Sequence, residues 1–74
     1  MPKLPTVTAK ETISALEKIG FQVVRQKGSH VRMKHKDNRV VTIPVHGNQN
    51  LGKGLLRKIL RDTELTVGEF LELL

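Results

Sequence analysis

The chain has 74 residues, no cysteine and a formal net charge of +6. Such a length makes one small domain, which we expect to span residues 1–74 without a disulfide or thiolate metal site. The sequence has no apolar run of the roughly 20 residues that a membrane helix needs, and no signal peptide at its start. We therefore expect a soluble cytoplasmic protein that makes no membrane contact.

The first predicted element is a helix over about residues 9–19. Thr8 and Glu11 have the spacing of a capping box, and apolar residues follow at helical intervals. Gly20 then stands where a left-handed residue commonly ends a helix.

Three strands joined by tight turns are predicted next. In the first, Phe21, Val23 and Arg25 alternate with Gln22, Val24 and Gln26 and should share one face. The third strand covers residues 39–43 and is rich in β-branched side chains. In the second strand, which follows the turn at residues 28–29, apolar and basic residues point to opposite faces: Val31 and Met33 against His30, Arg32 and Lys34.

Two further helices are predicted after a polar loop at residues 46–50. Leucine and isoleucine residues from Leu51 to Leu60 define the first, and Thr66 and Glu69 give the second a capping box. The expected fold is α+β: a three-stranded antiparallel sheet with helices on one face, in the order α-β-β-β-α, followed by a short additional C-terminal helix. The face with His30, Arg32 and Lys34 should remain open to solvent.

Positive charge is concentrated in the middle of the chain. Between Lys18 and Arg61 there are eleven basic residues and one acidic residue, Asp37. Such a one-signed segment favours a polyanionic partner. With two phenylalanines and no Trp or Tyr there is no platform for stacking bases, so the backbone and shape of a nucleic acid are the expected targets, as in double-stranded-RNA-binding folds.

Three histidines are candidates for chemistry. His30 shares its face with Arg32, and it can transfer protons near neutral pH beside cations that hold a phosphate. From the pattern alone, a histidine that only contacts phosphate explains this cluster equally well. His35 has the opposite parity and should be half-buried, while His46 lies in a loop and can order the loop or contact phosphate. No set of metal ligands is spaced to form a site, so neither a metal nor a cofactor is expected.

The sequence resembles the HicA family of bacterial toxins over nearly its whole length. The similarity rests on four blocks, which include Gly-Ser-His at 28–30 and Pro-Val-His-Gly at 44–47: residues 16–21, 24–30, 41–48 and 53–60. This resemblance implies a fold like that of double-stranded-RNA-binding domains and ribonuclease activity against mRNA. It also implies a HicB-type antitoxin that covers the active site. The family's catalytic histidine matches His30, but many members carry a second histidine where Val31 stands here.

The leading hypothesis is therefore an endoribonuclease toxin that uses His30 as a metal-free general acid or base. The predicted RNA-binding residues are Lys27, Gly28, Ser29, Arg32, Lys34, His46 and Lys53. No DNA contact is expected from this chain alone. Two alternatives remain: an RNA-binding module without catalysis, and a protein-interaction domain that has kept the fold and lost both activities.

Overall fold

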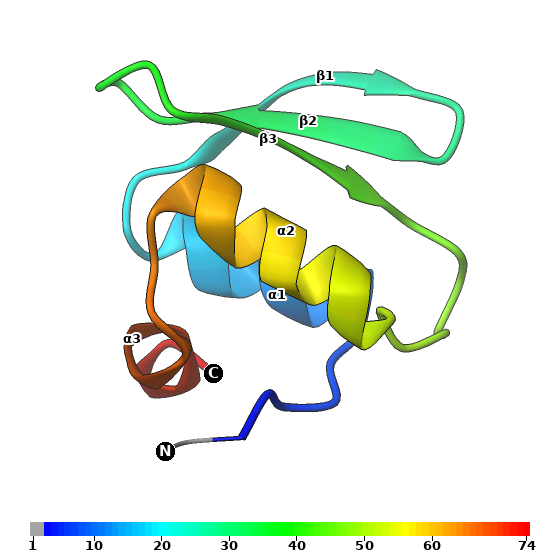
Figure 1. Ribbon diagram of the computed structural model, residues 1–74. Coiled ribbons are helices and arrows are strands. Elements are labelled where there is room, and N and C mark those ends of the chain that lie inside the picture. Colours follow the sequence, from blue (N-terminus) through cyan, green and yellow to red (C-terminus); the bar gives the residue numbers. More distant parts are fainter. Residues whose placement is uncertain (1–2) are drawn as a thin grey trace.

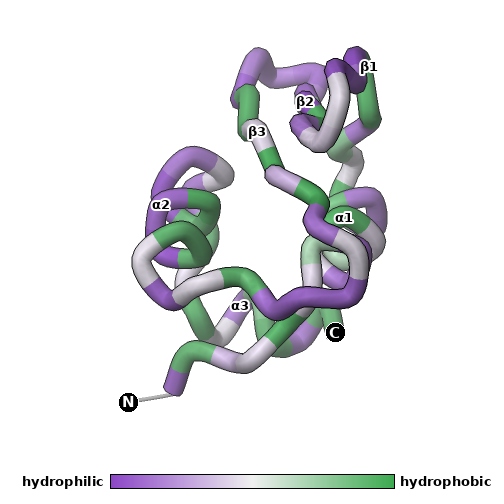
Figure 2. The backbone as a smooth tube through the Cα atoms, turned by 90° about the vertical axis from the view of Figure 1, so that its right-hand side faces the viewer, coloured by the Kyte–Doolittle hydropathy of each residue, from purple (hydrophilic) through white to green (hydrophobic). Residues whose placement is uncertain are grey.

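The elements follow the predicted order in the computed structural model, which describes residues 3–74. The strands pair antiparallel in the order β1-β2-β3, and the helices α1 and α2 both lie on one side of the sheet (Figures 1 and 2). This confirms the predicted α+β fold, with one helix added to the order of a double-stranded-RNA-binding domain. The elements are α1 (Ala9–Glu17), β1 (Gln22–Lys27), β2 (His30–Lys34), β3 (Val40–Pro44), α2 (Lys53–Thr63) and α3 (Val67–Glu72).

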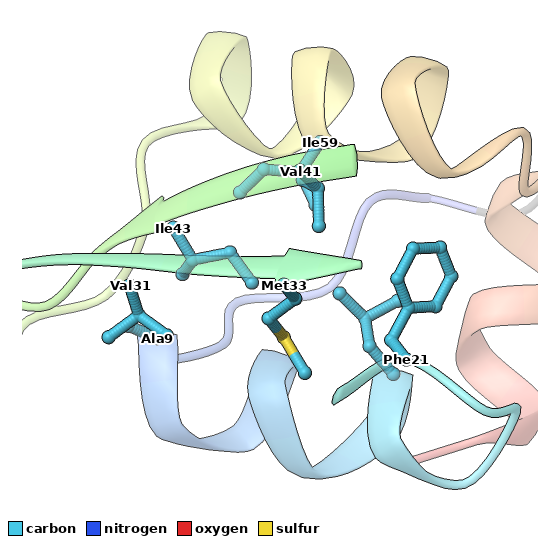
Figure 3. Close-up of a cluster of buried hydrophobic side chains, with 8 residues drawn as sticks. Ala9, Phe21, Val31, Met33, Val41, Ile43 and Ile59 are labelled. Atoms are coloured by element: carbon cyan, nitrogen blue, oxygen red, sulfur yellow. The ribbon is translucent and has the colours of Figure 1, made fainter. Parts of the chain in front are cut away.

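The core lies between the sheet and the helices α1 and α2. Val31 and Met33 of β2 are buried there, as their alternation predicts, and Val41 and Ile43 do the same from β3 (Figure 3). Ile59 of α2 lies against this layer, together with Ala9 and Leu16 of α1. Hydrophobic and hydrophilic residues follow one another along the tube of Figure 2, and the buried residues of β2 and β3 are hydrophobic ones. Within residues 3–74, none of the helices has the length and apolar character to cross a lipid bilayer.

The edge strand β1 departs from the prediction. All six of its residues are exposed, because β1 lies beyond the area that the helices cover (Figures 1 and 2). Val23 pairs with Met33 and Arg25 with Arg32, so Val24 is an extra residue in a β-bulge. A bulge shifts the alternation by one residue. The expectation that Val23 and Arg25 share a face is therefore wrong: Arg25 lies on the open face.

The last helix, α3, closes the lower end of the helical layer. Phe70 is fully buried in a second cluster with Val7, Ala15, Leu56 and Leu60. Its N-terminus has the predicted capping box: Thr66 Oγ1 accepts from the Glu69 N–H at 3.1 Å, and the Glu69 carboxylate accepts from the Thr66 N–H at 2.9 Å. The hydrogen bond that the carboxylate accepts from the Thr66 N–H, and in second place its interaction with the Thr66 hydroxyl, hold the pKa of Glu69 below its ordinary value.

This capping box makes a pH-dependent contribution to stability. Because the pKa of Glu69 is lowered on folding, its carboxylate stabilises the fold above its unfolded pKa, and this contribution is lost as the pH falls through the folded pKa. Glu69→Gln should therefore be less stable than the wild type at pH 7, and the difference should shrink toward pH 3. Urea unfolding at pH 7, 5, 4 and 3 measures it. The control is Glu72→Gln, at the C-terminal end of α3, where a carboxylate is unfavourable to the helix dipole. A difference for Glu69→Gln that stays constant down to pH 3 would contradict the assignment.

Candidate functional site

A shallow hollow of about 300 Å³ opens on the face of the sheet that the helices leave free. Residues of all three strands line it: Arg25, Lys27, His30, Arg32 and Thr42. Pairing across the strands brings them together, since Lys27 lies opposite His30, and Arg32 lies opposite Arg25 on one side and Thr42 on the other. Residues directly opposite in an antiparallel pair project from the same face. We name these five residues the His30 hollow.

The turn between β1 and β2 fixes one end of the His30 hollow. Gly28 takes a φ of +58°, which the first central residue of a type II′ hairpin turn requires and which glycine adopts without strain. The Ser29 carbonyl accepts a hydrogen bond from the Val45 N–H at 2.6 Å, so the turn is tied to the chain that leaves β3. Gly28 and Ser29 thus hold His30 at the end of β2 through backbone interactions.

The His30 hollow is positively charged, and no carboxylate lines it. Within residues 3–74 the Lys and Arg ion pairs are Arg39 with Asp37 and Lys58 with Asp62, both outside the hollow. Three cationic side chains therefore surround the imidazole without a counter-charge. Such a surface attracts anions, and more strongly at low salt.

The structure brings together only some of the predicted RNA-binding residues. Lys27 and Arg32 line the hollow with His30, and Gly28 and Ser29 form the turn beside it. Lys34 is exposed on β2, but it lies farther along the strand and lines a different hollow, with Gln22 and His35.

His46 and Lys53 also lie outside the His30 hollow. His46 is exposed and lines a small hollow with Asn50 and Leu55, next to the start of α2. Lys53 lines another with Lys3 and Arg57. These two residues can extend a nucleic-acid interface but do not belong to the hollow around the imidazole.

Two members of the hollow, Arg25 and Thr42, were not among the predicted site residues. Thr42 alternates with the buried residues Val41 and Ile43, so strand parity alone could have placed it on the open face. Arg25 could not be found in this way, because the bulge at Val24 reverses its parity. No other feature of the sequence marks that bulge.

A larger hollow, of about 560 Å³, lies at the opposite end of the sheet and contains His35. As predicted, this histidine is half-buried, and both of its ring nitrogens have partners. Nε2 lies 2.9 Å from the Ile19 carbonyl oxygen, which only accepts, so Nε2 carries the hydrogen and Nδ1 accepts from the Asp37 N–H at 3.2 Å. The imidazole also packs against Gly20, whose φ is +99°. The ring is structural, and we do not assign catalysis to this larger hollow.

Asp37 lies next to His35 in the turn between β2 and β3. Its carboxylate accepts hydrogen bonds from the Arg39 Nε at 3.1 and 2.9 Å, and this guanidinium holds the pKa of Asp37 below its ordinary value. Arg39 also donates to the Thr63 carbonyl oxygen at the end of α2. The carboxylate is thereby occupied, and among residues 3–74 no three His, Asp or Glu side chains are grouped to hold a metal ion.

A family comparison gives the context for this geometry. The family model described as the HicA toxin of bacterial toxin–antitoxin systems matches residues 9–65, from the start of α1 to just beyond α2. The comparison with curated proteins returned no match. The matched segment covers most of the chain and includes every residue of the His30 hollow. The chain therefore belongs to the HicA toxin family of bacterial toxin–antitoxin systems.

Proposed function

We propose that the protein is an endoribonuclease toxin that cleaves mRNA in the cytoplasm and is held inactive by a HicB-type antitoxin over the His30 hollow. The observation that carries this proposal is the exposed imidazole of His30 among Arg25, Lys27 and Arg32, with no carboxylate in the hollow. A titratable nitrogen beside uncompensated cations suits a reaction at a phosphodiester. Family membership supplies the toxin role and a toxin–antitoxin partner.

The proposed reaction is cleavage by the ribose 2′-hydroxyl. His30 accepts the proton of this hydroxyl as its oxygen attacks the neighbouring phosphorus. The bond from phosphorus to the 5′-oxygen then breaks, and the proton passes from the imidazolium to that leaving oxygen. Charge builds up on the non-bridging phosphate oxygens in the transition state, where Lys27 and Arg32 stabilise it. No step in this scheme requires a metal or a cofactor.

A non-catalytic RNA-binding module is the second candidate. It is favoured by the presence of a single imidazole in the hollow, since His35 and His46 line other hollows. End-labelled RNA incubated with the purified protein and EDTA separates the two functions. New fragments support the ribonuclease, whereas protected but intact RNA supports the binding module and contradicts the ribonuclease.

The contribution of Lys27 to RNA binding can be measured through salt dependence. Each phosphate that a cation neutralises releases counterions, and this makes the logarithm of the affinity fall with the logarithm of the salt concentration. Lys27→Gln should weaken binding and reduce the slope by about one. The matched control is Lys10→Gln, which removes an exposed lysine from α1, away from the sheet. Equal slopes for the two variants would contradict the placement of RNA on the open face.

A further inference from the structure

Two arginines lie directly opposite each other at the centre of the His30 hollow. Arg25 of β1 pairs with Arg32 of β2, and both side chains are exposed on the open face. On its other side, Arg32 lies opposite the neutral Thr42. We propose that Arg25 and Arg32 form a paired site for one phosphate group, with Thr42 as an additional donor. The inference rests on the proposed function for its ligand, a phosphodiester of the RNA backbone.

The pair exists because of the bulge at Val24. With regular alternation from Val23, which pairs with the buried Met33, Arg25 would project from the side of the sheet that bears the helices. The extra residue turns Arg25 to the open face instead. Bulges often re-aim a side chain beside a functional site. The irregularity in β1 thus has a specific consequence, which is a second guanidinium beside Arg32.

In the unliganded protein this arrangement is unfavourable. Like charges directly opposite each other across two strands destabilise a sheet. No carboxylate lines the hollow to compensate them, and the acidic partners in the described part of the chain, Asp37 and Asp62, are engaged elsewhere. A bound anion would remove the repulsion. Neutralising one of the arginines should therefore raise the stability of the free protein and lower the stability of the protein with a bound anion.

The chemistry of the pair selects a phosphate group. A guanidinium is planar and always charged, and it donates two parallel hydrogen bonds to the oxygens of a carboxylate or a phosphate. Two guanidiniums that face one anion can engage both non-bridging oxygens of a phosphodiester, and the Thr42 hydroxyl can donate a further hydrogen bond. His30, opposite Lys27, lies two rungs along the ladder and is therefore the next residue of β2 on the same face as Arg32. The paired site therefore holds the RNA backbone next to the imidazole.

Thermal unfolding of Arg25→Gln and Arg32→Gln tests this inference. The control is Arg61→Gln, which removes the same charge from an exposed position in the last turn of α2. In dilute potassium chloride, each hollow variant should have a Tm about 3 °C above that of the wild type, because one neutralisation removes the repulsion. The Tm of the double variant should be little higher than that of either single variant, because one substitution already removes the repulsion. Arg61→Gln should not gain, since a cation is favourable at a helix C-terminus.

Potassium phosphate is then compared with potassium chloride at equal ionic strength. Phosphate should raise the Tm of the wild type and of Arg61→Gln, but not of either hollow variant. RNA affinity, measured with His30→Ala added to each protein so that the RNA stays intact, should fall about tenfold or more for the hollow variants. An unchanged or lowered Tm of the hollow variants in chloride, or equal stabilisation of all proteins by phosphate, overturns the paired site.

These outcomes are independent of the ribonuclease proposal. Stabilisation by phosphate that depends on Arg25 and Arg32 supports the paired site, even if the wild type leaves RNA intact and the ribonuclease proposal fails. Conversely, RNA cleavage by a wild type whose response to phosphate does not depend on these arginines overturns the paired site alone.

Discussion

His30→Ala should lower the rate of RNA cleavage by about 100- to 10,000-fold, the range that a positioned general acid or base contributes. RNA affinity should change much less, because Arg25, Lys27 and Arg32 remain in the hollow. The His30 side chain is exposed and outside the core, so the variant should fold like the wild type. Single-turnover cleavage of a labelled RNA, with binding measured separately, determines both quantities.

The matched control for this experiment is His46→Ala. His46 is also an exposed histidine near the same end of the sheet, since it follows Val45, whose N–H bonds to Ser29. Its side chain lines a different hollow, so this variant should keep most of the cleavage rate and lose at most some affinity. If His46→Ala is the inactive variant and His30→Ala cleaves normally, the catalytic assignment is wrong.

Induction in cells gives a second readout of the same pair of variants. The wild type and His46→Ala should arrest growth, whereas His30→Ala should not, although all three proteins accumulate. Growth arrest by His30→Ala, together with persistent RNA cleavage, would contradict the role of His30. Growth arrest without any RNA cleavage would instead indicate a toxin that acts by binding RNA.

The order of the elements could be predicted from the sequence because each follows from a local pattern. The capping boxes at Thr8 and Thr66 mark the starts of two helices, and both form as expected. The alternation of Val31 and Met33 with basic residues correctly predicted which residues of β2 are buried and which are exposed. Apolar and polar residues alternate strictly in β2 because one face of the strand is buried in the core. Burial of that face also fixes the register in which the strand pairs with its neighbours.

The composition of the site could be predicted only in part. Parity placed His30 and Arg32 on one face, and Lys27 is close to them in sequence because it stands at the same hairpin turn. Parity also placed Lys34 on this face, but it lies farther along β2 and lines another hollow. Lys53 was grouped with them on charge, which carries no distance information, and it too lines another hollow.

Arg25 was missed for a different reason. A bulge adds one residue to a strand, and an exposed edge strand has no buried face that would record the shift in its alternation. Val23 and Val24 are exposed for the same reason. Apolar residues in a strand normally indicate the face that points to the core, but in β1 they do not.

Phe70→Ala should reduce the free energy of unfolding by about 3 to 5 kcal/mol, the usual cost of truncating a buried aromatic side chain. Phe70 is fully buried and joins α3 to residues of α1 and α2, including Ala15, Leu56 and Leu60. At about 0.05–0.15 kcal/mol per residue, a chain of 74 residues has only about 4 to 11 kcal/mol in total. The variant should therefore be partly unfolded at 37 °C, and its midpoint in urea should fall sharply.

The neighbouring position supplies the control. Leu71 is next to Phe70 on α3, but 37% of its surface is exposed, so Leu71→Ala should cost far less. The comparison also isolates the contribution of α3, which follows the segment that matches the HicA family at residues 9–65. A similar, small loss for both variants would mean that α3 is not integral to the core. A large loss for Phe70→Ala alone would show that the HicA fold in this chain depends on the helix that follows it, because without it Leu56 and Leu60 lose their partner.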